Sequence, residues 1–253
     1  MNDTREWLEP DGLGGFAMGT ADGIRTRRYH AILLSASQPP EGRRVLVADV
    51  EVYVDTAAGR FALSSHRYHG DAVHPDGAAH LAAFAWHPWP RWDYHLPDGT
   101  RVAYELVVAP GSPHVCLRWT KIAGTATNLH VRPFLAGRDY HSTHHENPVF
   151  RFEPDQRGEQ VIWHPYPGVP SVAALSDGIY IHGGGWYRGF HYSEEAARGL
   201  DAEEDLASPG ELEFDLGAGP AHLAFSANGW GDQTAAGFVD ATFESERKRR
   251  ATF

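Results

Sequence analysis

The sequence is poor in cysteine and contains no long hydrophobic run. Of its 253 residues only Cys116 is a cysteine, so no intrachain disulfide can form and a reducing compartment is favoured. No apolar run approaches the roughly 20 residues that a membrane-spanning helix needs. The polar N-terminus also lacks the apolar segment of a signal peptide. We therefore expect a cytoplasmic protein that has no membrane partner.

Basic residues are scarce as well. The chain holds 22 lysines and arginines against 33 acidic residues, which gives a formal net charge of -11. A negative field repels phosphate backbones, so we expect no nucleic-acid partner, whereas a neutral glycan is not repelled. Eight tryptophans and 16 histidines are present. Rings and polar side chains together suit sugar binding, but large β cores use aromatic residues too, and composition alone favours that second explanation.

Most of the chain shows the alternation of β-strands. In residues 45–54, Val50, Val52 and Val54 share one face, with Glu51 and Tyr53 on the other. The other expected strands are residues 60–63, 100–108, 114–122, 128–135, 149–152, 160–164, 172–175, 178–182, 210–216 and 221–226. Turn residues predict two hairpins, one of 45–54 with 60–63 and one of 210–216 with 221–226. Short strands at this spacing predict an all-β sandwich or barrel.

One helix is expected, near the C-terminus. Residues 232–250 place Phe238, Ala241 and Thr242 at spacings of three and four. The last turn is basic, at residues 247–250, which suits the negative end of a helix dipole. The acidic segment 193–206 lacks a clear apolar stripe, so we expect a loop with at most one helical turn.

The first dense motif is glycine-rich. Gly12, Gly14 and Gly15 allow tight turns and a close approach of the backbone. The segment lacks the Lys-Ser/Thr pair of a phosphate-binding P-loop, and no strand–helix unit surrounds it. We therefore expect no nucleotide and no other cofactor.

The second motif is Thr26-Arg27-Arg28-Tyr29-His30. On a strand, adjacent arginines would point to opposite faces. One arginine could then donate hydrogen bonds to sugar hydroxyls in a groove. The alternative is an arginine fixed in a buried ion pair that ties two sheets together, and the sequence leaves both interpretations open.

The third motif is the densest cluster of titratable side chains. Arg138 and Asp139 are expected to form a charge-assisted pair. His141, His144 and His145 follow in a segment that reads as a loop, without the helical spacing of a zinc-binding HExxH pair, so no metal is expected. The histidines are predicted to satisfy loop backbone groups or to face solvent, and to contact a glycan if the loop borders a cleft.

The fourth motif combines aromatic and acidic residues. Trp186 and Tyr187 are predicted to be exposed and could form a stacking platform for sugar rings. Two of the carboxylates downstream could act as the acid and base of a glycosidase. Solvated surface acids are the stronger explanation, because the sequence gives no carboxylate separation. These carboxylates include Glu194, Glu195, Asp201 and Glu204.

Taken in order, these motifs resemble the N-terminal domain of the bacterial and archaeal type of glycogen debranching enzyme, the amylo-α-1,6-glucosidase family. The resemblance extends from about Trp7 to Ser226, and the opening block through His30 is quite specific. Pro10-Asp11 and Ala31 depart from the family pattern, although Asp11 keeps a side chain that can form an Asx-type turn. The matching stretches are residues 6–9, 12–17, 19–20, 26–30, 138–141, 186–188, 198–201, 204–205 and 208–210.

The resemblance implies a large, supersandwich-like antiparallel β-sandwich packed against an α/α-barrel catalytic domain of the same protein. Such enzymes are glycoside hydrolases of glycogen catabolism that hydrolyse α-1,6-linked glucose at branch points of glycogen or maltodextrin, and their acid and base lie in the barrel. We therefore expect residues 1–230 to be the sandwich, residues 231–253 to be a linker helix, and the barrel to begin beyond residue 253. No catalytic residue is expected in this chain.

The resemblance assigns the motif residues an accessory role at the barrel interface or at the rim of its cleft, where they could contact α-glucan. Two alternatives stay open, namely a free-standing glycan-binding module and an autonomous glycosidase. The residues expected to bind substrate or to form the domain interface are Arg27, Arg28, Tyr29, His30, Arg138, Asp139, His141, Trp186 and Tyr187.

Overall fold

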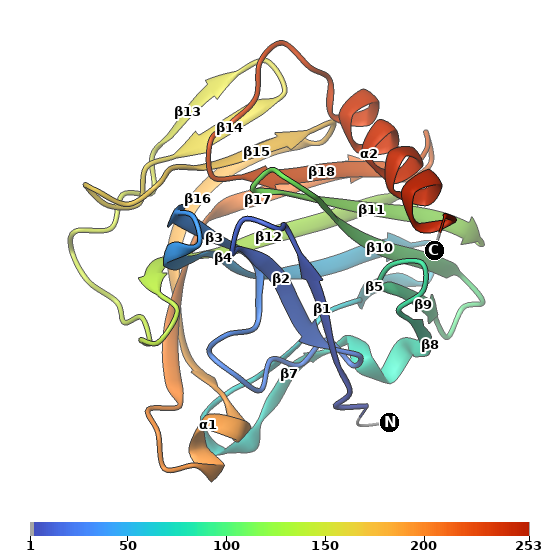
Figure 1. Ribbon diagram of the computed structural model, residues 1–253. Coiled ribbons are helices and arrows are strands. Elements are labelled where there is room, and N and C mark those ends of the chain that lie inside the picture. The colour runs from blue at the N-terminus through green and yellow to red at the C-terminus, as the bar shows by residue number, and fades with distance from the viewer. Residues whose placement is uncertain (1–2, 253) are drawn as a thin grey trace.

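The computed structural model describes residues 3–252 and shows two large antiparallel sheets packed face to face (Figure 1). The first sheet has the order β1 (Glu6–Pro10), β2 (Phe16–Thr20), β3 (Ala31–Gln38), β4 (Glu41–Thr56), β12 (Asn128–Asp139), β17 (Glu203–Asp215) and β16 (Ile179–His191), and β5 (Gly59–Ala62) pairs with β4. The second has the order β13 (Pro154–Arg157), β14 (Gln160–Trp163), β15 (Val172–Ser176), β18 (Ala221–Ser226), β11 (His114–Ala123), β10 (Arg101–Ala109), β9 (Arg91–His95) and β8 (Leu81–Ala85).

Smaller elements complete the fold, and the all-β class predicted from the sequence is confirmed. They are the two-stranded sheet of β6 (Ser65–Arg67) and β7 (Val73–Asp76), the 3-10 helices η1 (His69–Asp71) and η2 (Gly77–His80), and the helices α1 (Ser193–Ala197) and α2 (Ala235–Arg250). Within residues 3–252, no helix is long and apolar enough to cross a membrane.

The core lies between the inner faces of the two sheets. Val50, Val52 and Val54 point into it from β4, as their alternation predicts, and meet side chains of the second sheet such as Leu106 and Trp119. Burial of side chains of this kind stabilises the fold by about 1.5–3 kcal/mol each. One apolar core shared by both sheets therefore fixes which face of each strand points inward.

Several sequence expectations for the strands are corrected. Residues 149–152 form a turn and loop rather than a strand. The expected hairpin of 210–216 with 221–226 is wrong, because β17 pairs with β12 and β16 while β18 pairs with β11 and β15. The glycine-rich turn between β17 and β18 therefore crosses from one sheet to the other, whereas the hairpin of β4 with β5 is confirmed.

The helical predictions are largely confirmed. α1 is one short helix, and the rest of the acidic segment enters β17 at Glu203. α2 begins at Ala235, where the Thr234 side chain accepts a hydrogen bond from the Gly237 N–H and caps the helix. Figure 1 shows α2 beside β18 on the second sheet, at the opposite end of the molecule from α1. Val239 and Phe243 bury its apolar face.

Candidate functional site

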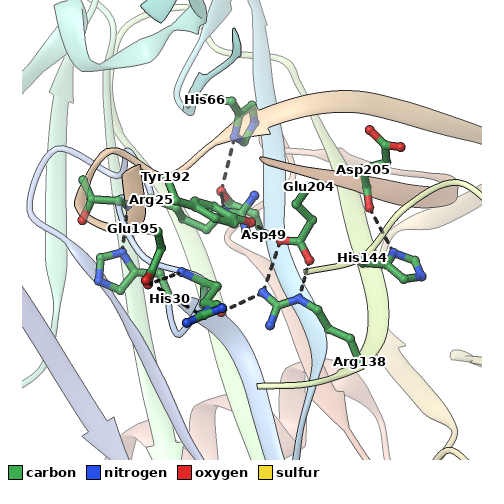
Figure 2. Close-up of polar contacts among 12 residues, drawn as sticks. Arg25, His30, Asp49, His66, Arg138, His144, Tyr192, Glu195, Glu204 and Asp205 are labelled. Atoms are coloured by element: carbon green, nitrogen blue, oxygen red, sulfur yellow. Dashed lines mark hydrogen bonds and ion pairs between the residues drawn. The ribbon is translucent and has the colours of Figure 1, made fainter. Parts of the chain in front are cut away.

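Three segments that are distant in the sequence meet beside β4 of the first sheet. They are the loop of residues 21–30, the end of β12 with the loop after it, and the turn from β16 through α1 into β17. Figure 2 shows how their charged side chains converge. Arg25, Arg138 and Glu204 of these segments, together with Asp49 of β4, are each at most 9% exposed as residues. We call these four, with Tyr192, the buried ionic network.

Arg25 joins the two halves of the network. Its Nε donates to Asp49 Oδ2 over 3.0 Å, and its Nη1 donates to the Tyr192 hydroxyl over 2.6 Å. The Tyr192 hydroxyl donates in turn to Glu204. Burial opposes ionisation of Asp49, but the hydrogen bond with His66 and the charge of Arg25 hold its pKa below the usual range. Burial raises the pKa of Tyr192, so its hydroxyl stays protonated and can donate.

Arg138 completes the network from β12. Its Nε donates to Glu204, and its Nη2 donates to Glu204 Oε2 over 3.2 Å and to the Arg28 carbonyl over 2.7 Å. The predicted Arg138–Asp139 side-chain pair is therefore wrong, because consecutive residues of a strand point to opposite faces. Asp139 instead accepts a hydrogen bond from the His141 N–H over 2.9 Å.

The segment 26–30 is a loop, so the expectation of a strand is also corrected. The Thr26 N–H donates to His30 Nδ1 over 3.1 Å, which folds the loop back on itself and places the His30 proton on Nε2. That proton points at Glu6 Oε1, 3.0 Å away. Burial lowers the pKa of His30 and favours its neutral form. The hydrogen bond from His30, aided by Arg27, lowers the pKa of Glu6 to about 2.

Glu195 of α1 holds the loop of residues 26–30 in place through its side chain. Its side chain is fully buried and accepts hydrogen bonds from the Arg28 N–H over 3.2 Å and from Arg198 Nη2 over 2.8 Å. Because a buried carboxylate needs compensating partners, α1 and the loop stabilise each other. The arginine at position 28 thus ties its loop to α1 and β12 rather than joining the two sheets.

Above this foundation lies a surface cluster of aromatic and basic side chains, Arg28, Tyr29, Arg43, Tyr140 and His141, which we call the tyrosine patch. The ring centroid of Tyr29 lies 5.6 Å from that of Tyr140 and 5.7 Å from that of His141. The Tyr29 hydroxyl is 3.1 Å from His141 Nδ1. The guanidinium of Arg28 lies 5.8 Å from the Tyr29 ring and that of Arg43 lies 5.6 Å from the Tyr140 ring. Both predicted motifs, 26–30 and 138–141, contribute to it.

Trp186 and Tyr187 do not join this patch, and they form no shared platform. Both are half-buried neighbours on β16 and point to opposite sides of it. Trp186 packs among His144 and other rings, with a centroid distance of 5.3 Å to His144. Tyr187 packs against Phe134 at 4.9 Å. The prediction that they are exposed is wrong because each side of β16 is covered by other side chains.

The histidine-rich loop satisfies backbone groups, as predicted for part of it. His144 is buried between the Asp205 carbonyl, 3.0 Å from its Nδ1, and the Tyr166 hydroxyl, 2.6 Å from its Nε2. His145 is exposed. Among residues 3–252, no three histidine, cysteine or acidic side chains are grouped so that they could hold a metal ion.

The four carboxylates considered for glycosidase chemistry do not face one another across a cleft. Glu195 and Glu204 have no exposed side-chain surface and are held by arginines. Glu194 lies at the surface 3.5 Å from Arg27, and Asp201 accepts a hydrogen bond from Thr143. A glycosidase needs one carboxyl group that can donate a proton to the leaving group. Glu195 and Glu204 cannot reach a sugar.

Sequence reasoning missed Arg25, Asp49, His66 and Tyr192. Asp49 carried a signal, because a charged residue in the otherwise apolar run of β4 needs a buried partner. Arg25 lies in a loop, His66 in the three-residue strand β6 and Tyr192 just before α1, where the stretches are too short for a periodic pattern. Their partners come from distant segments, so only the tertiary structure identifies them.

The Asx turn expected at Asp11 is present. Its Oδ1 accepts hydrogen bonds from the Leu13 N–H over 2.7 Å and from the Gly15 N–H over 2.9 Å. A Cβ at position 15 would lie 2.4 Å from the Asp11 carboxylate and 2.5 Å from the Leu34 carbonyl oxygen, so the turn requires glycine there. The turn that follows Pro10 is therefore fixed by the Asp11 side chain and by the glycine at position 15.

The fold and site define a large β-sandwich domain in which the motifs 26–30 and 138–141 build the buried support of a loop and one aromatic surface patch. Residues 5–222 match the model of the glycogen debranching enzyme N-terminal family. The chain belongs to that family, as its resemblance predicted. A search of curated proteins finds no match.

Proposed function

We propose that this chain is the accessory N-terminal domain of a glycogen debranching enzyme of the amylo-α-1,6-glucosidase type. In this role it supports a catalytic α/α-barrel and borders the glucan-binding cleft. Family membership over residues 5–222 supports the assignment. α2, the linker expected at residues 231–253, packs on the sandwich through Val239 and Phe243. That packing gives a following domain a fixed point of attachment.

The tyrosine patch is the surface that we assign to the barrel or to the rim of its cleft. It combines half-buried tyrosine rings with arginines, and both residue types are enriched in the centres of protein interfaces. Beneath it, Arg138 of the buried ionic network donates to the Arg28 carbonyl, and Glu195 of α1 accepts a hydrogen bond from the Arg28 N–H. A rigid support of this kind lowers the entropy that is lost when a partner binds.

The geometry of the acidic residues supports the accessory role over an autonomous glycosidase. Hydrolysis of a glycosidic bond uses two carboxyl groups about 5–5.5 Å apart with retention, or about 6.5–9.5 Å apart with inversion, on either side of the sugar. Here the most suggestive pair, Glu195 and Glu204, is buried under arginines. We therefore place the acid and base of the reaction in the barrel.

The proposal is tested by incubating the chain with a branched dextrin and measuring glucose, then passing it over immobilised amylose. We expect no glucose from the chain alone. Release of glucose would establish an autonomous glycosidase, and strong retention that is lost in Tyr29→Ala would favour a free-standing glycan-binding module.

The accessory role itself is tested in a polypeptide that carries both the sandwich and the barrel. Tyr140→Ala is expected to lower the temperature at which debranching activity is lost, because it removes a ring from the patch. Ile179→Ala is the matched control, since Ile179 is 74% exposed and lies outside the patch. Equal inactivation temperatures for wild type and Tyr140→Ala would contradict the assignment.

A further inference from the structure

A groove of about 820 Å³ runs along β1, and none of the tyrosine-patch residues lines it. All five residues of β1 line one side of it. Trp86, Pro88 and Pro90 line the other side, and Arg250 at the end of α2 closes part of it. Neither the motifs nor the proposed function account for this groove.

The free edge of the first sheet faces the groove. β1 is the terminal strand of that sheet and, among the described residues 3–252, pairs only with β2. The Ala21 N–H donates to the Arg5 carbonyl, and the Asp11 N–H donates to the Gly15 carbonyl. In an antiparallel pair the hydrogen-bonding direction alternates, so the odd-numbered residues of β1 bond to β2. The N–H and C=O groups of Glu6 and Leu8 therefore point toward the groove.

The exposed apolar side chains of the groove can contact an extended segment. Leu8 is 54% exposed and Trp86 is 44% exposed, which are high values for large apolar residues in this chain. The prolines of the opposite wall have no N–H, so they cannot donate to an added strand and leave its bonding to β1. The groove thus offers the outward N–H and C=O groups of β1 as hydrogen-bond partners for one added strand, with the apolar side chains of Leu8 and Trp86 beside them.

The charges in the groove are already neutralised. Arg250 binds both carboxylate oxygens of Glu9, at 3.0 and 2.5 Å. Glu6 is held by His30 and Arg27. A charged occupant would have to displace these partners, so an uncharged segment is favoured.

We propose that an extended, uncharged peptide segment of a partner protein binds in this groove as an additional strand beside β1. The N–H and C=O groups of Glu6 and Leu8 supply four main-chain hydrogen bonds, and the ladder ends at Pro10, which lacks an N–H. A second copy of this chain fits less well, because it would bring its own charged groove residues, such as Glu9 and Arg250, into the interface. The inference does not depend on the proposed function.

The test uses a library of random dodecapeptides displayed on phage and selected on the immobilised chain. A selected peptide is then synthesised, and its dissociation constant is measured for wild type and variants. Leu8→Pro removes the outward N–H but leaves the bonds to β2, so the fold is retained. We expect at least tenfold weaker binding to Leu8→Pro. Trp86→Ala is expected to weaken binding about fivefold.

Leu8→Ala is the matched control, because it keeps the N–H and removes most of the side chain. It should weaken binding less than Leu8→Pro does. Unfolding temperatures within a few degrees of wild type will show that the variants are folded. The proposal is overturned if selection yields no peptide, or if folded Leu8→Pro binds as tightly as wild type. It is also overturned if the chain forms a dimer that Leu8→Pro dissociates, since the edge then belongs to a second copy.

Discussion

The molecule is held together differently at its two extremes. Beneath the tyrosine patch, Arg138 and Glu204 lie fully desolvated with their partners around them. On the second sheet, α2 docks through Val239 and Phe243, and its ion pair between Asp240 and Arg118 lies nearer to solvent. Removing one charged member of the buried ionic network leaves its partners buried without a counter-charge, so the loss in unfolding free energy is large. Truncating an apolar side chain of α2 costs unfolding free energy in proportion to the apolar surface that is no longer buried.

Replacing one member of the buried ionic network should give the largest effect. Glu204→Gln keeps the size of the side chain but leaves Arg138 and Arg25 without their shared carboxylate. We expect a loss of about 3–5 kcal/mol in the free energy of unfolding, measured by urea denaturation. Glu194→Gln is the control, because Glu194 is a half-exposed carboxylate on the nearby helix α1, and its loss should stay within about 0.5 kcal/mol. Equal losses of unfolding free energy in Glu204→Gln and Glu194→Gln would show that burial of the carboxylate makes no difference.

Truncating the apolar contact of α2 should give the next largest effect. Phe243 is buried against Trp89, with ring centroids 5.1 Å apart. Phe243→Ala is expected to cost about 3 kcal/mol in unfolding free energy. Because α2 covers Cys116, the variant should also increase the rate at which a thiol reagent labels that residue. Unchanged labelling would show that α2 stays docked without this ring.

The N-cap of α2 allows helix formation to be tested apart from the packing of α2 on the second sheet. Thr234→Ala removes the side-chain acceptor for the Gly237 N–H. We expect a loss of about 1 kcal/mol in unfolding free energy. Thr234→Ser keeps the acceptor oxygen and should lie close to wild type. A loss of the same size in both variants would point to the methyl group rather than to the cap.

The smallest effect is expected for Glu6, whose carboxylate is held by Arg27 and His30. The pKa of Glu6 is about 2 in the folded chain, against an ordinary value of 4.5. Folding therefore favours the ionised form, and the resulting stabilisation is present above about pH 4.5 and is lost as the pH falls toward 2. Glu6→Gln should flatten the dependence of the melting temperature on pH in this window. An unchanged slope would contradict the role of Glu6.

Most strands could be predicted from the sequence, because alternation is a local pattern that burial of one face imposes. The run of valines from Val50 to Val54 located β4, and the spacing of Phe238 in residues 232–250 located α2. The partner of β18 could not be predicted in this way. Alternation says which face of a strand is inward but not which sheet it joins, so the cross-sheet turn before β18 was mistaken for a hairpin.

The candidate site was predicted in part. Arg138 was singled out correctly as a paired arginine, but its neighbour Asp139 was taken as the partner in place of Glu204. Nearness in sequence misled because adjacent residues of a strand face opposite ways. Trp186 was expected at the surface, and only the packing of the loop after β12 shows that it is half-buried.

By itself, the sequence determined the all-β class, the absence of an intrachain disulfide and the family. These follow from composition, local periodicity and ordered motifs, which act over a few residues at a time. Only the tertiary structure decided that Arg25 meets Tyr192, 167 positions away, and that β1, Trp86 and Arg250 enclose a groove. Such contacts depend on how the two sheets pack and on how the connections between them cross. A local sequence pattern therefore does not predict which residues far apart in the chain come into contact.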